Sequence, residues 1–125
     1  MSQYVETPTR TFTAGAAIAA GLRVKLTAGK LAVAGVADKE IGTLEAASFA
    51  DGDARAVRLR NAQGTRKMVA NGAISQGAAV FTAAGGKVGP SIATAFLIGT
   101  ALEAASADGD VIEVLPNVHG DTAAI

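Results

Sequence analysis

The chain contains the same phrase twice, and this repetition constrains its fold more than any other feature. Residues 44–53 read LEAASFADGD and residues 102–110 read LEAASADGD, so the two stretches match apart from one inserted residue, Phe49. The neighbouring residues recur in the same order, from about residues 15–61 to about residues 72–117. We therefore interpret the chain of 125 residues as an internal duplication.

Each copy consists of short apolar runs separated by turn residues, which is typical of β structure. Residues 22–26 (LRVKL) alternate apolar and polar side chains, as do residues 57–60. The ADGD segments are predicted turns, in which Gly52 is free to adopt a positive φ. Further strands are predicted at residues 31–33, 41–48, 80–82, 98–104 and 111–115, with a short helix or helical turn near residues 94–97.

The predicted fold class is mainly β. We expect a small β-barrel or sandwich of about eight strands, with pseudo-two-fold symmetry and at most one or two short helices, because such a fold hides sheet edges. One copy has too few strands and too little core to stand alone, so we expect the halves to pack on each other. Residues 1–13 are polar and are predicted to form an extended N-terminal arm, with residues 14–125 as a single β domain.

The composition excludes several kinds of chemistry. There is no cysteine, which removes disulfides, thiolate metal sites and thiol catalysis. The formal net charge is zero, so no strong overall field attracts nucleic acid or acidic membranes. The polar N-terminus does not resemble a signal peptide, and synthesis in the cytosol is expected. Aromatic residues make up 4% of the chain, so a thin core of small side chains is expected, which association with a partner would offset.

Candidate metal and catalytic residues are few. His119, the only histidine, follows the second copy and has no nucleophile at a recognisable spacing. Asp51 and Asp53, with Asp108 and Asp110, form two D-G-D segments that could bind calcium. A calcium ion takes about six or more oxygen ligands, which one such segment does not supply. We favour a role in the turns.

Glu45 and Glu103 occupy equivalent positions in the two copies. Paired carboxylates can act as general acid and base, but their symmetric placement follows from the duplication alone. The sequence therefore predicts no catalytic, cofactor-binding or metal-binding residues, no cofactor, and no enzymatic activity.

Charge is unevenly distributed along the sequence. No acidic residue occurs in residues 54–101, and no Lys or Arg follows Lys87. Two interpretations remain open: solvated faces of strands, or complementary patches that match one subunit to another or to a scaffold. Nucleic-acid binding is less favoured because few aromatic side chains are present to stack on bases.

The ordered series of motifs resembles a known family. A polar arm, Gly-x-x-Val turns and a Gly-Lys hairpin are followed by IGTALEAASADGDVIEVLP at residues 98–116. This series is similar to that of the capsid cement, or head decoration, proteins of tailed bacteriophages, over about residues 11–117. The resemblance implies a β-rich structural virion protein that binds the outside of an icosahedral capsid. It would stabilise the capsid by bridging major capsid protein subunits.

The resemblance also implies partners and a location. The partners are the phage major capsid protein and further copies of the chain, as a homotrimer or homodimer, without nucleic acid or membrane. The protein would be made in the cytoplasm of the host bacterium and reside on the outer capsid surface. The residues predicted to contact the capsid or a neighbouring subunit are Tyr4, Val5, Thr11, Phe12, Arg55, Arg58, Arg60, Arg66 and Lys67.

Three alternatives stay open. A carrier domain of the biotinyl or lipoyl type is also a duplicated β structure, and Lys39 in the segment ADKE would be its modified residue. The chain could instead be an enzyme or substrate-binding barrel with convergent polar residues in a pocket. A third possibility is another structural assembly module.

Overall fold

The computed structural model of the chain describes residues 9–62 and 64–116. The first copy contains β1 (Thr9–Thr13), β2 (Arg23–Thr27), β3 (Lys30–Val33), β4 (Gly42–Leu44) and β5 (Ala54–Leu59). The second contains β6 (Arg66–Val69), β7 (Ala79–Thr82), β8 (Val88–Gly89), β9 (Leu97–Ala101) and β10 (Val111–Pro116). The one helical element in these ranges is the 3₁₀ turn η1 (Ala84–Gly86). The prediction of a mainly β protein is confirmed.

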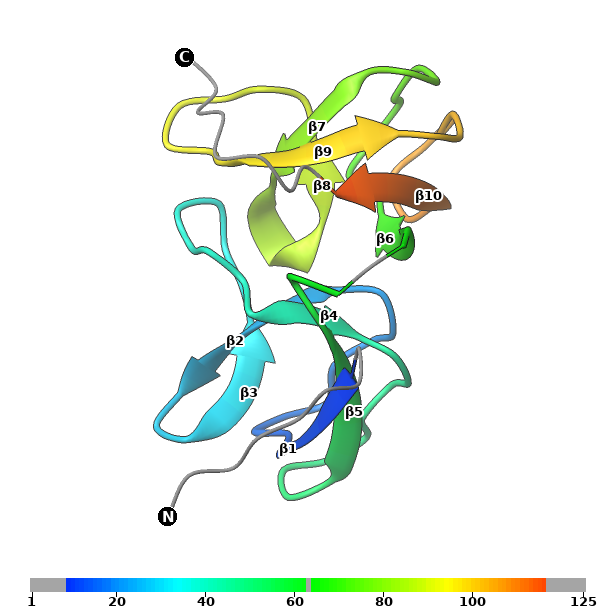
Figure 1. Cartoon of the computed structure of the whole chain (residues 1–125). Coiled ribbons are helices and arrows are strands. Elements are labelled where there is room, and N and C mark those ends of the chain that lie inside the picture. The colour runs from blue at the N-terminus through cyan, green and yellow to red at the C-terminus, as the bar shows by residue number, and fades with distance from the viewer. Residues whose placement is uncertain (1–8, 63, 117–125) are drawn as a thin grey trace.

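The two copies form two sheets with the same topology. The strand orders are β1-β5-β4-β2-β3 and β6-β10-β9-β7-β8, and all named neighbours are antiparallel. Each position in the first order is taken by the equivalent strand in the second, which confirms the internal duplication. In Figure 1 the first copy forms the lower half of the molecule and the second copy the upper half.

Each sheet curls so that its two edge strands approach each other. Parallel bridges join Ala14 to Leu31 in the first half and Ala70 to Val88 in the second. These bridges connect the end of the first strand of each copy to the third strand, across the mouth of the curled sheet. Each half is therefore a partly closed five-stranded barrel.

Each half contains its own hydrophobic core. The first core consists of Ile18, Val24, Leu31, Leu44 and Val57. The second consists of Met68, Ala70, Ile74, Val80, Val88, Ile98, Ala101, Ala105, Ile112 and Val114. The sequence predicts too few strands and too little core in one copy for it to stand alone, whereas in the structure each half encloses a core of its own. Curling allows five short strands to surround a small cluster of mostly aliphatic side chains.

Two glycines at equivalent positions permit the close strand pairing in each half. A Cβ atom on Gly42 would overlap the Arg58 carbonyl oxygen on β5, and a Cβ atom on Gly99 would overlap the Leu115 carbonyl oxygen on β10. The predicted positive φ of Gly52 is confirmed, at 100°. Its counterpart Gly109 has a φ of 97°.

The structure differs from the sequence predictions at three strands and one turn. β1, β6 and β8 were not predicted, and β1 places the last five residues of the predicted arm in the sheet, where Thr9 pairs with Arg58. Residues 1–8 lie outside the described part of the chain. Residues 93–94 form a turn in which Thr94 has a positive φ, and β9 begins at Leu97.

Candidate functional site

The two halves are joined by a buried arginine. Arg23 on β2 is 0% exposed. Its guanidinium reaches into the second half, where Nη2 donates to the Ala83 carbonyl at 2.6 Å and Nε donates to the Lys87 carbonyl at 3.0 Å. Nη2 also donates to the carbonyls of Ala34 and Gly35 within the first half. This one side chain therefore fixes the loop after β3 and the η1 hairpin to the same point.

The charge of Arg23 is balanced by Glu40. Nη1 lies 3.4 Å from Glu40 Oε1, and Glu40 is also buried. Burial lowers the pKa of Arg23, whereas the attraction and hydrogen bond of Glu40 oppose that decrease. A guanidinium with a fork of five donors suits several carbonyl acceptors at once.

The joint between the halves has further polar contacts and is not repeated by the duplication. Thr82 Oγ1 donates to the Val36 carbonyl at 2.6 Å and accepts from the Phe96 N–H at 2.9 Å. Val24 pairs with Gly42 in the first half, and Val80 pairs with Gly99 in the second, so the two strand pairs have the same register. The residue before each valine is Arg23 in the first half and Ala79 in the second. Ala79 therefore occupies the position equivalent to Arg23, and the second copy has no counterpart of this arginine.

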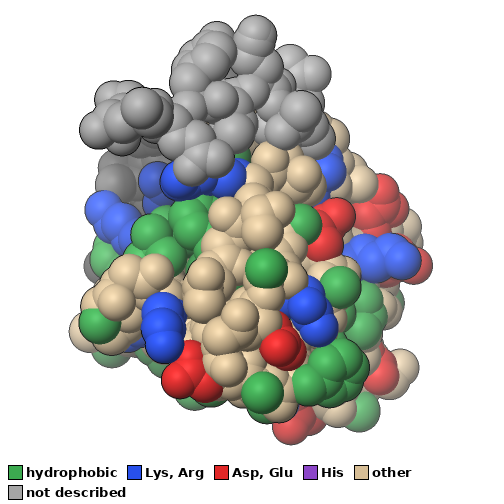
Figure 2. All heavy atoms as spheres, turned by 90° about the horizontal axis from the view of Figure 1, so that it is seen from below, with side chains coloured by type: hydrophobic (Ala, Val, Ile, Leu, Met, Phe, Trp, Pro, Cys, Tyr) green, Lys and Arg blue, Asp and Glu red, His purple; other side chains and the backbone are tan. Residues whose placement is uncertain are grey.

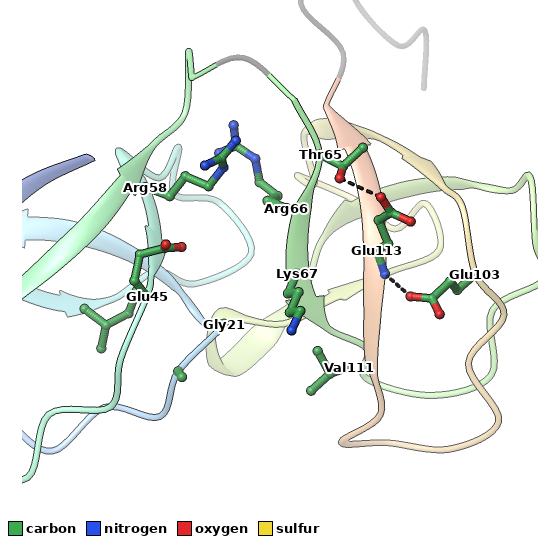
Figure 3. Close-up of a pocket in the computed structure, with 11 residues that line it drawn as sticks. Gly21, Glu45, Arg58, Thr65, Arg66, Lys67, Glu103, Val111 and Glu113 are labelled. Carbon is green, nitrogen blue, oxygen red and sulfur yellow. Dashed lines mark hydrogen bonds between the residues drawn. The ribbon is translucent and has the colours of Figure 1, made fainter. Parts of the chain in front are cut away.

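A groove of about 860 Å³ lies between the halves. Figure 3 shows its walls, with β6 running between Glu45 in the first half and β10 in the second. Charged side chains of both signs line it, namely Arg58, Arg66, Lys67, Glu45, Glu103 and Glu113. The groove is therefore polar without an excess of one sign.

The groove does not combine Glu45 and Glu103 into an acid–base pair, and the predicted equivalence of the two is wrong in the structure, where the Leu102 N–H makes the hydrogen bond that matches that of Glu45. Glu45 lies on the first-half wall, whereas Glu103 lies beyond β10 (Figure 3). Glu103 Oε1 accepts the Glu113 N–H at 2.8 Å, and Glu113 Oε2 accepts the Thr65 hydroxyl at 2.6 Å. These two carboxylates on the second-half wall organise the surface of β10 and β6.

Arg66 is a buried residue of the connection between the halves. Its Nη2 donates to the Arg60 carbonyl at 3.1 Å and to the Ala62 carbonyl at 3.4 Å. Burial lowers the pKa of Arg66, and repulsion by the nearby Arg58 lowers it further. Arg66 therefore stabilises the path of the chain from β5 to β6.

The other predicted contact residues occupy separate places. Phe12 packs against the first core, and Arg58 lines the groove. Arg55 donates from Nε to the Ala47 carbonyl and from Nη1 to the Ala54 carbonyl, each at 2.8 Å. Thr11, Arg60 and Lys67 are exposed. Tyr4 and Val5 lie outside the described residues. The structure thus brings Arg58, Arg66 and Lys67 together at the groove and leaves Phe12 and Arg55 elsewhere.

The two D-G-D turns have the same hydrogen bonds. In each turn the second aspartate accepts two backbone N–H groups through Oδ2. The distances are 2.8 Å from Phe49 and 3.1 Å from Ala50 to Asp53, and 2.8 Å from Ser106 and 3.1 Å from Ala107 to Asp110. The hydrogen bonds from Phe49 and Ala50 lower the pKa of Asp53, with a smaller contribution from Arg55.

The first aspartate of each turn forms an ion pair with an equivalent lysine. Lys30 Nζ lies 2.8 Å from Asp51, and Lys87 Nζ lies 2.7 Å from Asp108. The carboxylates of both turns therefore already have protein partners. Among residues 9–62 and 64–116 no cluster of three or more His, Cys, Asp or Glu side chains has the arrangement to hold a metal ion.

The uneven distribution of charge along the sequence is partly offset by ion pairs. Arg55 and Lys87, from the segment without acidic residues, pair with Asp53 and Asp108, which lie outside that segment. Figure 2 shows basic and acidic side chains interspersed over the face seen from below in Figure 1. The described part of the chain also has no helix with the length and hydrophobicity required to cross a membrane.

The fold and its polar contacts define the class of protein: a small, duplicated, all-β protein. Its charged side chains stabilise the D-G-D turns and the contact between the two halves. A family model described as phage cement protein matches residues 3–116. The chain therefore belongs to the phage cement protein family, and its role is structural and associated with the phage capsid. A comparison with curated proteins gives no match.

Proposed function

We propose that the chain binds the outside of an icosahedral phage capsid and stabilises it by bridging major capsid protein subunits. The observation that carries this proposal is the family match, which extends over residues 3–116 and thus over both copies of the duplication. The proposed partners are the major capsid protein and further copies of the chain, as a homodimer or homotrimer. Neither nucleic acid nor a membrane is required.

The division of the molecule into two halves supports a bridging role. Each half has its own core, and Arg23 holds the first half to the carbonyls of Ala83 and Lys87 in the second. A rigid molecule with two outward ends can contact two neighbouring subunits at once. The second contact is then intramolecular and strengthens attachment through a high effective concentration.

The predicted contact residues that lie in the described chain divide into two groups on structural grounds. Thr11, Arg60 and Lys67 have exposed side chains and are retained as proposed contacts, together with the partly exposed Arg55 and Arg58. Tyr4 and Val5 remain proposals from the sequence. Phe12 packs in the first core, and Arg66 is buried between the halves, so the position of each is explained by the fold.

The proposal is tested with heads of the phage that encodes the chain, prepared without this protein. Purified protein is added, the heads are sedimented, and the bound protein is measured against concentration. We expect saturable binding and a higher temperature of head disruption for decorated than for bare heads. The absence of saturable binding would contradict the proposal.

The carrier-domain alternative is not favoured by the surroundings of Lys39. The strands that flank Lys39, β3 and β4, are not neighbours in the sheet, so Lys39 does not lie at the tip of a hairpin. Its Nζ instead lies 5.0 Å from the centroid of the Phe96 ring in the second half. Intact mass of the protein purified from its host would reveal any attached biotinyl or lipoyl group.

A further inference from the structure

Phe49 is the residue by which the first copy of the repeated phrase exceeds the second. Its side chain is 77% exposed, the largest value among the large hydrophobic residues of the described chain. Leu26, on the same half, is 46% exposed by comparison. A protruding phenyl ring is unusual in a chain in which aromatic residues make up 4% of the sequence.

The turn holds Phe49 in a defined position. The Phe49 N–H donates to Asp53 Oδ2 at 2.8 Å, which fixes the backbone from which the side chain projects. The Arg55 guanidinium lies 5.9 Å from the centroid of the phenyl ring, and Arg55 is itself held by the Ala47 and Ala54 carbonyls. An exposed side chain on an ordered backbone loses less entropy when it binds than one on a mobile loop.

The turn does not need the phenyl ring of Phe49 in order to form. In the second copy Ser106 occupies the same position, and Asp110 accepts its two backbone N–H groups at the same distances as Asp53. The lysine–aspartate pair beside the turn is also present in both copies. The duplication thus contains its own control, which shows that the hydrogen bonds of the turn need a backbone N–H at this position but no phenyl side chain.

We propose that Phe49 is an anchor residue that inserts into an apolar pocket of the major capsid protein. Because the second half has Ser106 at the equivalent position, this contact determines which half of the chain faces that pocket. The inference rests on the proposed function. A second copy of this chain is a poorer partner, because six of the eleven residues that line the groove between its halves are charged. Aromatic side chains in apolar pockets frequently dominate the affinity of protein interfaces.

The test compares two variants of Phe49 with one control. F49A removes the ring, and Phe49→Ser gives the first turn the residue that the second turn has at this position, Ser106. Leu26→Ala removes another exposed apolar side chain from the same half. We expect both Phe49 variants to bind bare heads about 30-fold or more weakly than the wild type. We also expect Leu26→Ala to bind with nearly wild-type affinity, and all three variants to keep the wild-type circular dichroism spectrum.

The outcomes separate this inference from the proposed function. Binding of F49A with wild-type affinity would overturn the anchor and leave the proposed function standing, whereas failure of the wild type to bind would count against the proposed function itself. A change in the sedimentation of free F49A, relative to free wild type, would assign Phe49 to a contact between copies and overturn the inference. An equal loss of affinity in Leu26→Ala would also overturn it.

Orientation is tested separately by electron cryomicroscopy of decorated heads. We expect the turn at residues 49–53 to face the capsid protein. A map in which the turn at residues 106–110 occupies that position would overturn the assignment of orientation.

Discussion

Single residues in equivalent positions have the same physical role in the two copies. Gly42 and Gly99 allow the backbone of the next strand to approach, and Gly52 and Gly109 adopt positive φ in the turns. The turn glycine was predictable because D-G-D is a local pattern. The strand glycine was not, because the close approach arises from a pairing partner, Arg58 in the first copy, that is distant in sequence.

Alanine at either strand glycine is expected to destabilise the protein strongly. In Gly42→Ala or Gly99→Ala the new methyl group would overlap a carbonyl oxygen of the neighbouring strand, so the free energy of unfolding should fall by about 2–4 kcal/mol. Gly72→Ala is a matched control, because a Cβ atom there meets nothing within 4 Å. It should change stability by less than about 1 kcal/mol. Urea denaturation measures all three, and equal effects would contradict the argument.

Stability should decrease in acid in part because of Asp53. The hydrogen bonds of the turn lower its pKa in the folded state, so its contribution is present above the unfolded-state pKa of about 3.9. The contribution is lost as the pH falls through the lower folded-state pKa. In Asp53→Asn we expect lower stability at pH 7 and a smaller decrease as the pH is lowered below about 4. Urea denaturation across this range measures both, and an unchanged pH dependence would contradict the assignment.

Among the strands, some could be predicted from the alternation of apolar and polar residues and others could not. Residues 22–26 and 57–60 alternate apolar and polar side chains, and strands β2 and β5 formed there. β1 and β6 were not predicted because each begins in a polar or basic stretch. Phe12 packs against the first core and Met68 lies in the second, and these contacts form only when the sheets curl.

Deletion of β1 is expected to disrupt the first half. Removal of residues 1–13 takes away the partner of β5 and the core contact of Phe12. Removal of residues 1–8 leaves β1 complete and is the matched control. Hydrogen exchange should show loss of protection in β5 for the longer deletion, with a smaller effect for the shorter one. Equal protection of β5 in the two deletions would show that β1 does not stabilise the sheet.

At the scale of the whole molecule, the contact between the two halves is the feature that could not be predicted from the sequence. The alternation of LRVKL assigns Arg23 to a polar, solvated face of its strand. The structure buries Arg23, because the carbonyls of Ala83 and Lys87 in the second half accept hydrogen bonds from it, whereas Lys25 on the same face stays partly exposed. The duplication could be predicted from the sequence, because the second copy repeats the motifs of the first in the same order. The contact between copies could not, because Arg23 occurs in only one of them.

Removal of Arg23 is expected to uncouple the halves. Arg23→Ala would leave Glu40 buried without its counter-ion and several carbonyls without a donor, at a cost of about 3–5 kcal/mol. We also expect unfolding to separate into two transitions, because each half keeps its own core. Lys30→Ala, which breaks an exposed ion pair, should cost less than about 1 kcal/mol. Calorimetry measures both quantities, and a single cooperative transition in Arg23→Ala would contradict the uncoupling.

The rigidity that Arg23 imparts has a geometric consequence. In the proposed bridging role, two ends held at one separation by Arg23 and the neighbouring contacts would fit attachment points at one spacing and not those at another. The permitted spacing would then depend on a buried residue that is remote from the capsid surface. Loss of Arg23 would allow the chain to bind lattices of more varied spacing, with lower affinity for each.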